Sequence, residues 1–184
     1  MRENVRIVLV LTVVCAVCAF LLAFVNSVSQ AKIEDNARQK IEQAILTLMP
    51  AASRIEDTVI NGQVIHKLFD AENKHIGYAF LAKGNGYQGA INILVITNPS
   101  LDTLEGIEIV DSVETPGLGA KIKDAFFKDQ FKQLDIVLEI EATKDVPTKP
   151  NQVQSISSAT ISSKSVVNIL NKNIAQIRQA LSAQ

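Results

Sequence analysis

Hydroxyl side chains crowd into one short stretch near the end of the chain, "SSATIS", residues 157–162. It lies between an apolar, strand-like run and an apolar pattern at helical spacing, so we expect it at the start of a helix. The first N–H groups of a helix lack intrahelical partners, and the macrodipole makes this end positive. Such an end suits an anion, phosphate above all. Ordinary N-capping, which needs only one hydroxyl, is the alternative.

A second stretch with chemical potential is "ETPGLGAKI", residues 114–122, which follows a predicted strand and opens a predicted helix. Gly117 and Gly119 permit positive φ and close approach of the backbone to a ligand, and Pro116 stiffens the turn. The stretch is not a dinucleotide fingerprint, because the third glycine and a parallel βαβ context are missing. On its own, a Gly-x-Gly turn of this kind is usually a simple strand-to-helix connection.

The composition argues against several other chemistries. Both cysteines, Cys15 and Cys18, lie in the N-terminal apolar segment, which excludes a disulfide framework or a cysteine-ligated metal site in the rest of the chain. A net charge of −1 removes the electrostatic case for nucleic acid. His66 and His75 have no clustered carboxylates and no nucleophile–base arrangement, so we predict no metal site and no catalytic residue.

An uncharged apolar run, "IVLVLTVVCAVCAFLLAFV", occupies residues 7–25. As a helix it would rise about 28 Å, close to the hydrocarbon thickness of a bilayer. The run is longer than the core of a signal peptide, which favours an uncleaved anchor over a cleaved signal. We expect a cytoplasmic stub over residues 1–6, a transmembrane anchor over residues 7–29 and an extracytoplasmic domain over residues 30–184. The flanking Lys and Arg residues do not decide this orientation, which depends on the shortness of the stub.

The rest of the chain predicts an α+β domain, an antiparallel sheet with packed helices. Residues 31–50 are predicted to form an amphipathic helix that Pro50 ends. Its apolar face would consist of Ile33, Ala37, Ile41, Ile45 and Leu48. Residues 58–110 follow a strand period, with turns at Asn61-Gly62 and at residues 70–74, and so predict a meander.

The last third of the chain predicts helices around one further strand. Residues 120–131 read as a short helix with Ile122, Phe126 and Phe127 turned inward, and residues 134–140 as a strand. Pro147 and Pro150 mark a loop. The chain closes with a helix whose apolar residues repeat at steps of three and four: Val166, Leu170, Ile174, Ile177 and Leu181.

Together these features resemble the FMN-binding domain shared by the G subunit of Rnf-type ion-translocating ferredoxin:NAD oxidoreductases and the C subunit of the sodium-translocating NADH:quinone reductase. The resemblance covers nearly the whole chain: the anchor, the helix ending "LTLMPAA", the strand entry "GYQGAINILV", the loop "ETPGLGAKI" with its following "FKDQF", and "SSATIS". The length is closer to that of the Rnf protein, because the quinone-reductase relative is longer.

The family's attachment motif is an acidic residue, any residue, Ser or Thr, Gly, Ala and Thr, and the last Thr carries FMN as a phosphoester made by a separate flavin transferase. The resemblance therefore implies covalent FMN on Thr160, with Ser157 and Ala159 matching the motif. Ser158 stands where Gly is usual, and Ser155 where the acidic residue is usual.

The resemblance also implies that the "ETPGLG" loop lines the flavin, and hydroxyls at the helix start would donate to the phosphate. The implied cofactor residues besides Thr160 are Ser157, Ser158, Ala159, Ser162, Glu114, Thr115, Gly117, Leu118 and Gly119. Tyr78 and Tyr87 could touch a flavin ring, although half-buried strand tyrosines are commoner. Lys121 and Lys123 are more simply explained as a solvated helix face than as partners of the phosphate.

The implied function is electron transfer on FMN, within a single-pass subunit of the cell (inner) membrane that works with the other membrane subunits of an Rnf complex. The flavin does the redox chemistry and the protein supplies position and electrostatics, so the chain is not an enzyme alone. Two alternatives remain open: a stand-alone extracytoplasmic flavoprotein of another electron chain, and a signal-anchored structural module without flavin.

Overall fold

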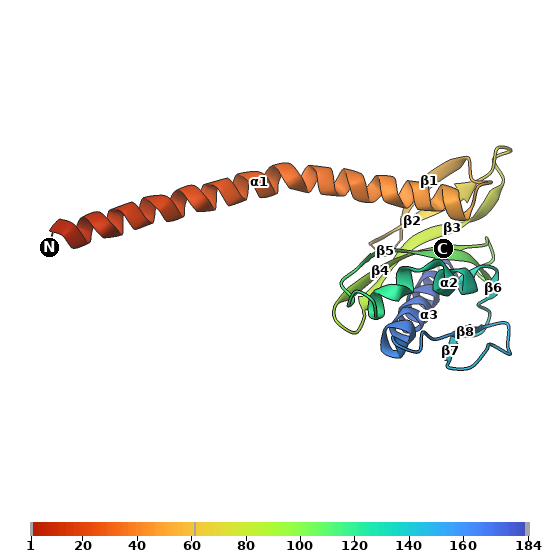
Figure 1. Ribbon diagram of the computed structural model, residues 1–184. Coiled ribbons are helices and arrows are strands. Elements are labelled where there is room, and N and C mark those ends of the chain that lie inside the picture. The colour runs from red at the N-terminus through yellow and green to blue at the C-terminus, as the bar shows by residue number, and fades with distance from the viewer. Residues whose placement is uncertain (1, 61, 183–184) are drawn as a thin grey trace. The chain divides into compact units, whose positions relative to one another are not determined.

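The computed structural model describes residues 2–60 and 62–182. By internal contacts the chain divides into two units, Met1–Lys40 and Ile41–Gln184. One helix, α1 (Arg2–Leu48), runs through the first unit and ends in the second (Figure 1). The side chain of Ile33 and the turn residue Asn61 lie outside the part of the structure that is described.

The first unit is a helix with the length and composition to cross a membrane over Asn4–Ser27, where the mean hydropathy is 3.1. None of this stretch is buried, and large side chains such as Phe20 and Leu22 are more than two-thirds exposed. A continuous apolar surface of this kind is unusual on a protein in water, and it suits a bilayer. The limits of the stub and of the anchor stay predictions.

The second unit is built on a six-stranded antiparallel sheet, in which each strand pairs with its neighbours in sequence. This order confirms the predicted meander and the α+β class. The strands are β1 (Arg54–Ile60), β2 (Gln63–Phe69), β3 (His75–Asn85), β4 (Ala90–Thr97), β5 (Thr103–Ser112) and β6 (Leu134–Asp135). The predicted turn at residues 70–74 is present, because the Asp70 carboxylate accepts the N–H groups of Glu72 and Lys74, both at 2.9 Å.

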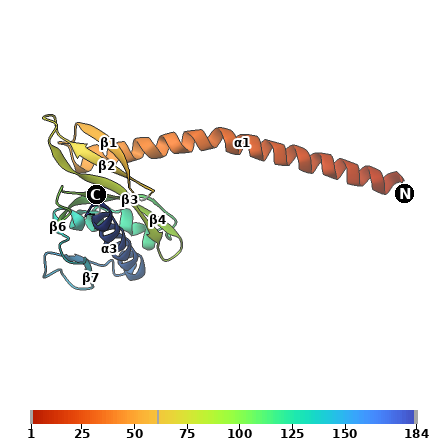
Figure 2. The same cartoon turned by 180° about the vertical axis from the view of Figure 1, so that it is seen from behind.

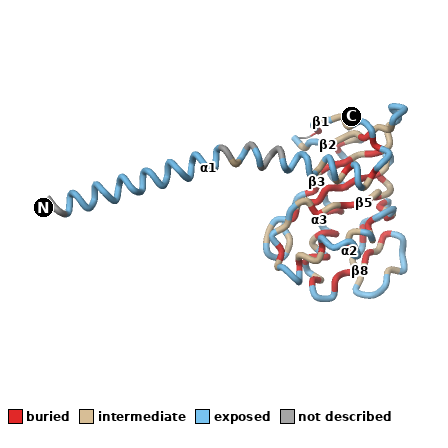
Figure 3. Tube along the Cα trace, turned by 45° about the horizontal axis from the view of Figure 1, so that its top comes forward, coloured by how far each residue is buried: buried red, intermediate tan, exposed pale blue. Residues whose placement is uncertain are grey.

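Both faces of the sheet are apolar and both are covered. On one face, residues such as Ile65, Phe80 and Ile93 form the main core with α3 (Thr160–Ser182), which lies across the sheet (Figure 2). On the other, Leu68 and Leu94 contact the last turns of α1 and the residues just after it: Ile41, Ala44, Ile45, Leu48, Met49 and Ala52. Buried residues follow the strands and α3 (Figure 3).

The closing helix and the end of the first helix lie where they were predicted, but Ala37, predicted on the apolar face of residues 31–50, is exposed. The apolar face of α3 is confirmed: Val166, Leu170, Ile174 and Ile177 are buried, and Leu181 packs at the margin. α1 ends at Leu48, two residues before Pro50, as a proline requires.

The predicted helix of residues 120–131 is three short turns: η1 (Gly119–Lys123), α2 (Ala125–Lys128) and η2 (Asp129–Phe131). Ile122 and Phe127 are buried as predicted, but Phe126 is 58% exposed, so its predicted inward position is wrong. The backbone of Asp124 is extended (φ −73°, ψ 145°), which resets the helical phase. Phe131 is buried instead, with its ring centroid 5.3 Å from that of Phe127.

The predicted strand at residues 134–140 is also shorter than expected, because pairing with β5 stops at Asp135. The Asp135 carboxylate accepts the N–H of Val137 at 2.8 Å and turns the chain away. Beyond this turn, β7 (Glu141–Thr143) and β8 (Gln152–Gln154) form a small parallel pair, with Pro147 and Pro150 in the loop between them, as predicted.

Candidate functional site

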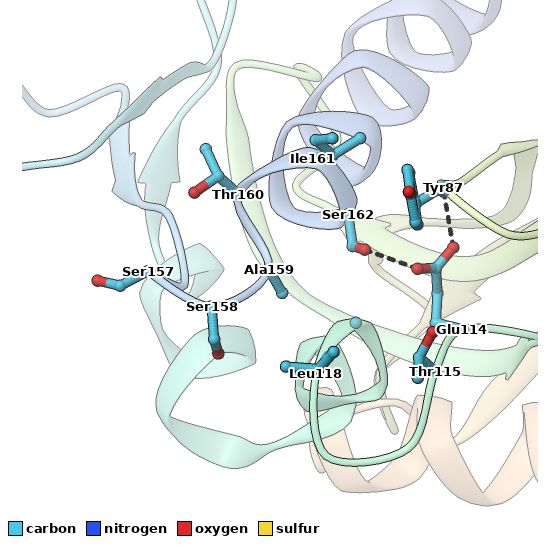
Figure 4. Close-up of a pocket in the computed structure, with 11 residues that line it drawn as sticks. Tyr87, Glu114, Thr115, Leu118, Ser157, Ser158, Ala159, Thr160, Ile161 and Ser162 are labelled. Carbon is cyan, nitrogen blue, oxygen red and sulfur yellow. Dashed lines mark hydrogen bonds between the residues drawn. The ribbon is translucent and has the colours of Figure 1, made fainter.

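A cleft of about 280 Å³ lies where three separate segments meet: the β3–β4 loop, the loop after β5, and the start of α3 (Figure 4). Its lining residues are Tyr87, Glu114, Thr115, Leu118, Gly119, Ser157, Ser158, Ala159, Thr160, Ile161 and Ser162. Nine of the ten cofactor residues predicted from the sequence are in this set. The structure therefore brings together "ETPGLG" and "SSATIS", which are about forty residues apart in the chain.

The first turn of α3 has backbone N–H groups that are available to bind an anion. The helix begins at Thr160, and the carbonyl of Ala159 just before it accepts the N–H of Ser163 at 2.9 Å. Ala159 has no side-chain oxygen, so ordinary hydroxyl capping does not occur at this position. Across residues 2–60 and 62–182, no side-chain oxygen accepts the N–H of Thr160, Ile161 or Ser162. The helix end can therefore receive acceptor oxygens from a ligand.

The three hydroxyls in the first turn of α3 differ in their hydrogen bonds. Those of Ser162 and Ser163 are buried and hydrogen-bonded, at 2.6 Å to Glu114 Oε2 and 3.0 Å to the Ala159 carbonyl. The Thr160 hydroxyl is half-buried, and its one contact, to the carbonyl of Ile156, is long at 3.4 Å. Figure 4 shows the Thr160 and Ser157 side chains turned away from Glu114. Thr160 thus has less to lose on chemical modification than Ser162 or Ser163, the two other hydroxyls in the first turn of α3.

Glu114 lines the cleft, but its hydrogen bonds go to the protein. The side chain is only 6% exposed. One carboxylate oxygen accepts the backbone N–H groups of Tyr87 at 2.7 Å and Gln88 at 3.1 Å, and the other accepts the Ser162 hydroxyl. Glu114 was predicted as a cofactor contact, and that prediction is not tested by these bonds.

The loop that follows Glu114 is a tight turn. The Thr115 carbonyl accepts the N–H groups of Leu118 at 3.2 Å and Ala120 at 3.0 Å. Gly117 has φ +75°, a conformation that favours glycine. It is the predicted cofactor residue that is not in the cleft lining, so its evident contribution is to the turn.

The open side of the cleft is apolar. Tyr87, Leu118 and Ile161 are 64%, 49% and 59% exposed, although each lines the cleft. Such surfaces suit a flat aromatic ligand. Ile161 was not predicted, and its position inside a run of hydroxyl residues was the available signal. Tyr87 was considered beside Tyr78, which instead contacts His75, with ring centroids 4.6 Å apart.

The remaining weaker candidates lie outside the cleft. His66 pairs with Asp57 (Nδ1 to Oδ1, 2.6 Å), and burial lowers the pKa of His75. Within the described part of the chain, no three His, Cys, Asp or Glu side chains are placed to hold a metal ion. Lys121 and Lys123 are not in the cleft lining.

Comparison with known proteins agrees with this geometry. The FMN-binding domain family matches residues 86–175, a range that includes all of the cleft. The G subunit of the Na⁺-translocating ferredoxin:NAD⁺ oxidoreductase complex of Acetobacterium woodii is 30% identical over 192 residues, covering 95% of this chain and 91% of the relative. The G subunit of the ion-translocating oxidoreductase complex of Methanosarcina acetivorans is 28% identical over 181 residues, covering 94% of each chain.

The fold also matches a solved structure. The crystal structure of Shewanella oneidensis NqrC superposes with a TM-score of 0.54 at 17% identity, covering 71% of this chain and 73% of that one. This likeness concerns the fold alone. The near full-length match to these relatives, together with the FMN-binding domain, shows that the chain belongs to the G-subunit family of Rnf-type ion-translocating ferredoxin:NAD oxidoreductases.

Proposed function

We propose that this protein is a membrane-anchored electron-transfer subunit of an Rnf-type complex, and that its electrons are carried on FMN bound covalently to Thr160. The observation that carries the proposal is the position of the Thr160 hydroxyl. It stands at the edge of the cleft, at a helix end whose first N–H groups have no side-chain acceptor among the described residues, inside an FMN-binding domain.

The residues of the cleft fit a flavin phosphate. The positive end of α3 and its unaccepted N–H groups favour an anion, an effect worth about 0.3–1 kcal/mol at an exposed site. Ser157 and Ser158 are exposed beside this end and can donate further hydrogen bonds. Leu118, Tyr87 and Ile161 offer apolar surface to an aromatic ring system. FMN bound here would supply the electron-carrying chemistry, and the chain would supply its position and surroundings.

The attachment is a phosphoryl transfer that a separate flavin transferase would catalyse. The Thr160 oxygen forms an ester bond to the phosphorus of a flavin nucleotide, the bond from phosphorus to its leaving group breaks, and the hydroxyl proton is lost. No electrons are exchanged. The phosphodiester keeps one negative charge, which the helix end can accommodate. Relative to free FMN and protein, the product has lost one water.

The anchor and the domain serve a membrane assembly. α1 can cross the membrane over Asn4–Ser27, and the family consists of subunits of membrane complexes. We place residues 30–184 on the extracytoplasmic side, where a covalent bond keeps FMN from diffusing away. The apolar run of residues 7–25 contains no charged side chain, so ion translocation belongs to the neighbouring subunits.

Intact mass spectrometry tests the attachment. The full-length protein, co-expressed with a flavin transferase, should gain the mass of FMN minus water, and Thr160→Ala should gain none. Ser165→Ala is the matched control, because it removes a hydroxyl from the same helix that lies outside both the motif and the cleft lining, and it should still be modified. An adduct that persists on Thr160→Ala would refute the assignment of the residue.

Copurification tests the place of the protein in a complex. A tagged copy expressed in its own host should bring down membrane subunits that carry iron–sulfur clusters. A flavinylated protein that purifies alone from gently solubilised membranes would favour the stand-alone flavoprotein. Unmodified protein after co-expression with the transferase would favour the structural module.

A further inference from the structure

Glu114 connects all three segments that form the cleft. The residue opens the loop after β5, its Oε1 accepts N–H groups of Tyr87 and Gln88 from the β3–β4 loop, and its Oε2 accepts the hydroxyl of Ser162 in α3 (Figure 4). These partners are 27, 26 and 48 residues away in the chain. Within the described residues, no other single side chain hydrogen-bonds to both the β3–β4 loop and the first turn of α3.

The space around this carboxylate is left open by two glycines. A Cβ added to Gly86 would lie 2.2 Å from Oε1, and one added to Gly119 would lie 2.3 Å from Oε2. Real Cβ atoms do not approach a neighbour so closely, so neither position admits a side chain while Glu114 stays in place. The two glycines come from different segments of the cleft, and both shape it around the same group.

The chemistry of the three partners identifies what Glu114 does. All three are donors, two amides and one hydroxyl, and a carboxylate buried among donors acts as an acceptor. A glutamine side chain could reproduce the arrangement: its oxygen would accept both amides, and its NH₂ group would donate to the Ser162 oxygen. The bonds therefore require the shape and polarity of the side chain, and not its charge.

We propose that Glu114 is a positioning residue, a latch that fixes the β3–β4 loop and the loop after β5 against the helix that carries Thr160. The hydrogen bonds of Glu114 are independent of the proposed function, but the statement that the cleft binds a flavin rests on it. With the latch made, Tyr87, Leu118 and Ile161 stand at fixed places around the cleft. Without it, the β3–β4 loop and the start of α3 lose their shared side-chain partner.

The test compares Glu114→Ala with Glu114→Gln in the full-length protein in detergent. Amide hydrogen exchange is measured first in a Thr160→Ala background, which carries no flavin at this position. In Glu114→Ala, exchange at the amides of Tyr87 and Gln88 should accelerate on the order of tenfold, because both lose their acceptor. Glu114→Gln should stay close to the parent. Asp111→Ala, which removes an exposed carboxylate from the same strand, is the matched control.

The second readout uses the flavinylated protein. Iodide quenching of flavin fluorescence should be stronger in Glu114→Ala than in the parent, and Glu114→Gln should restore the parent value. If Glu114→Ala fails to fold, Ser162→Ala takes its place, because it removes one of the three bonds. It should increase both the amide exchange rate and the iodide quenching, by smaller factors than those expected for Glu114→Ala.

Two results would overturn the latch: unchanged exchange at the amides of Tyr87 and Gln88 in Glu114→Ala, or a Glu114→Gln variant as impaired as Glu114→Ala, which would mean that the charge matters. Parent protein that never acquires FMN would refute the proposed function, while the exchange measurements would still decide the latch.

Discussion

Replacing Gly119 by alanine should be much more damaging than the same replacement at Gly117, two residues away. The new Cβ at position 119 would lie 2.3 Å from Glu114 Oε2 and 2.7 Å from Ser162 Oγ, the two atoms of a buried hydrogen bond. The carboxylate must move, and in moving it gives up a buried hydrogen bond; leaving a buried polar partner unsatisfied costs about 1–3 kcal/mol. With residual crowding, we expect the free energy of unfolding to fall by about 2–4 kcal/mol.

Gly117 makes a matched control because its constraint is of another kind. Its φ is +75°, and an added Cβ would meet nothing within 4 Å. Alanine there costs only the strain of a left-handed residue, about 1–2 kcal/mol. Urea unfolding of the full-length variants, followed by far-ultraviolet circular dichroism, measures both. A Gly119→Ala variant that is no less stable than Gly117→Ala would refute the reasoning that the cleft is closed around the Glu114 carboxylate.

Three further predictions concern other parts of the domain. Lys164 is exposed one helical turn after Thr160, where its positive charge can interact with a phosphate on Thr160. Lys164→Gln should therefore reduce the stability gained on flavinylation by about 0.3–1 kcal/mol, and by less at high salt. Thermal unfolding of the loaded and unloaded protein measures this difference. Burial lowers the pKa of His75, so that as the pH falls the unfolded chain binds a proton at this histidine before the folded protein does. The free energy of unfolding should therefore fall as the pH drops below 6.5, and His75→Phe should flatten that part of the pH–stability curve. Phe127→Ala should cost about 3–5 kcal/mol and Phe126→Ala less than about 1 kcal/mol in urea unfolding.

Each of these has a control in the same chain. Lys172 is exposed two turns further along α3, and its replacement by glutamine should leave the effect of flavinylation unchanged. His66 is paired with Asp57 at the surface, and it is the control for His75. The His66→Phe variant should still lose stability below pH 6.5, because His75 is unchanged in it. Equal costs for Phe126→Ala and Phe127→Ala would contradict the break in helical phase at Asp124.

The parts of the fold that could be predicted are those that depend on the spacing of apolar residues close together in the sequence. Alternation in the strands and the spacing of Val166, Leu170 and Ile174 depend on local geometry, and they predicted the meander and the buried face of α3 correctly. Phe126 was misplaced because one extended residue, Asp124, interrupts a run that reads as a continuous helix.

The site itself was predicted through motifs, and its internal hydrogen bonds were not predictable. The resemblance supplied nine residues that line the cleft, but the partners of Glu114 lie 26 to 48 residues away and follow no period. Tyr87 could be weighed only as one of two tyrosines, because its place beside the cleft depends on the β3–β4 turn, where the N–H of Gly86 donates to the Gly89 carbonyl at 2.7 Å.

The buried face of α3 needs no ligand to complete it, since Val166, Leu170 and Ile174 already fill the core beneath the sheet. We therefore expect folding and the proposed flavin attachment to be separable events. Cells starved of riboflavin should accumulate a stable, colourless pool of the protein that becomes competent once the vitamin returns, without new synthesis.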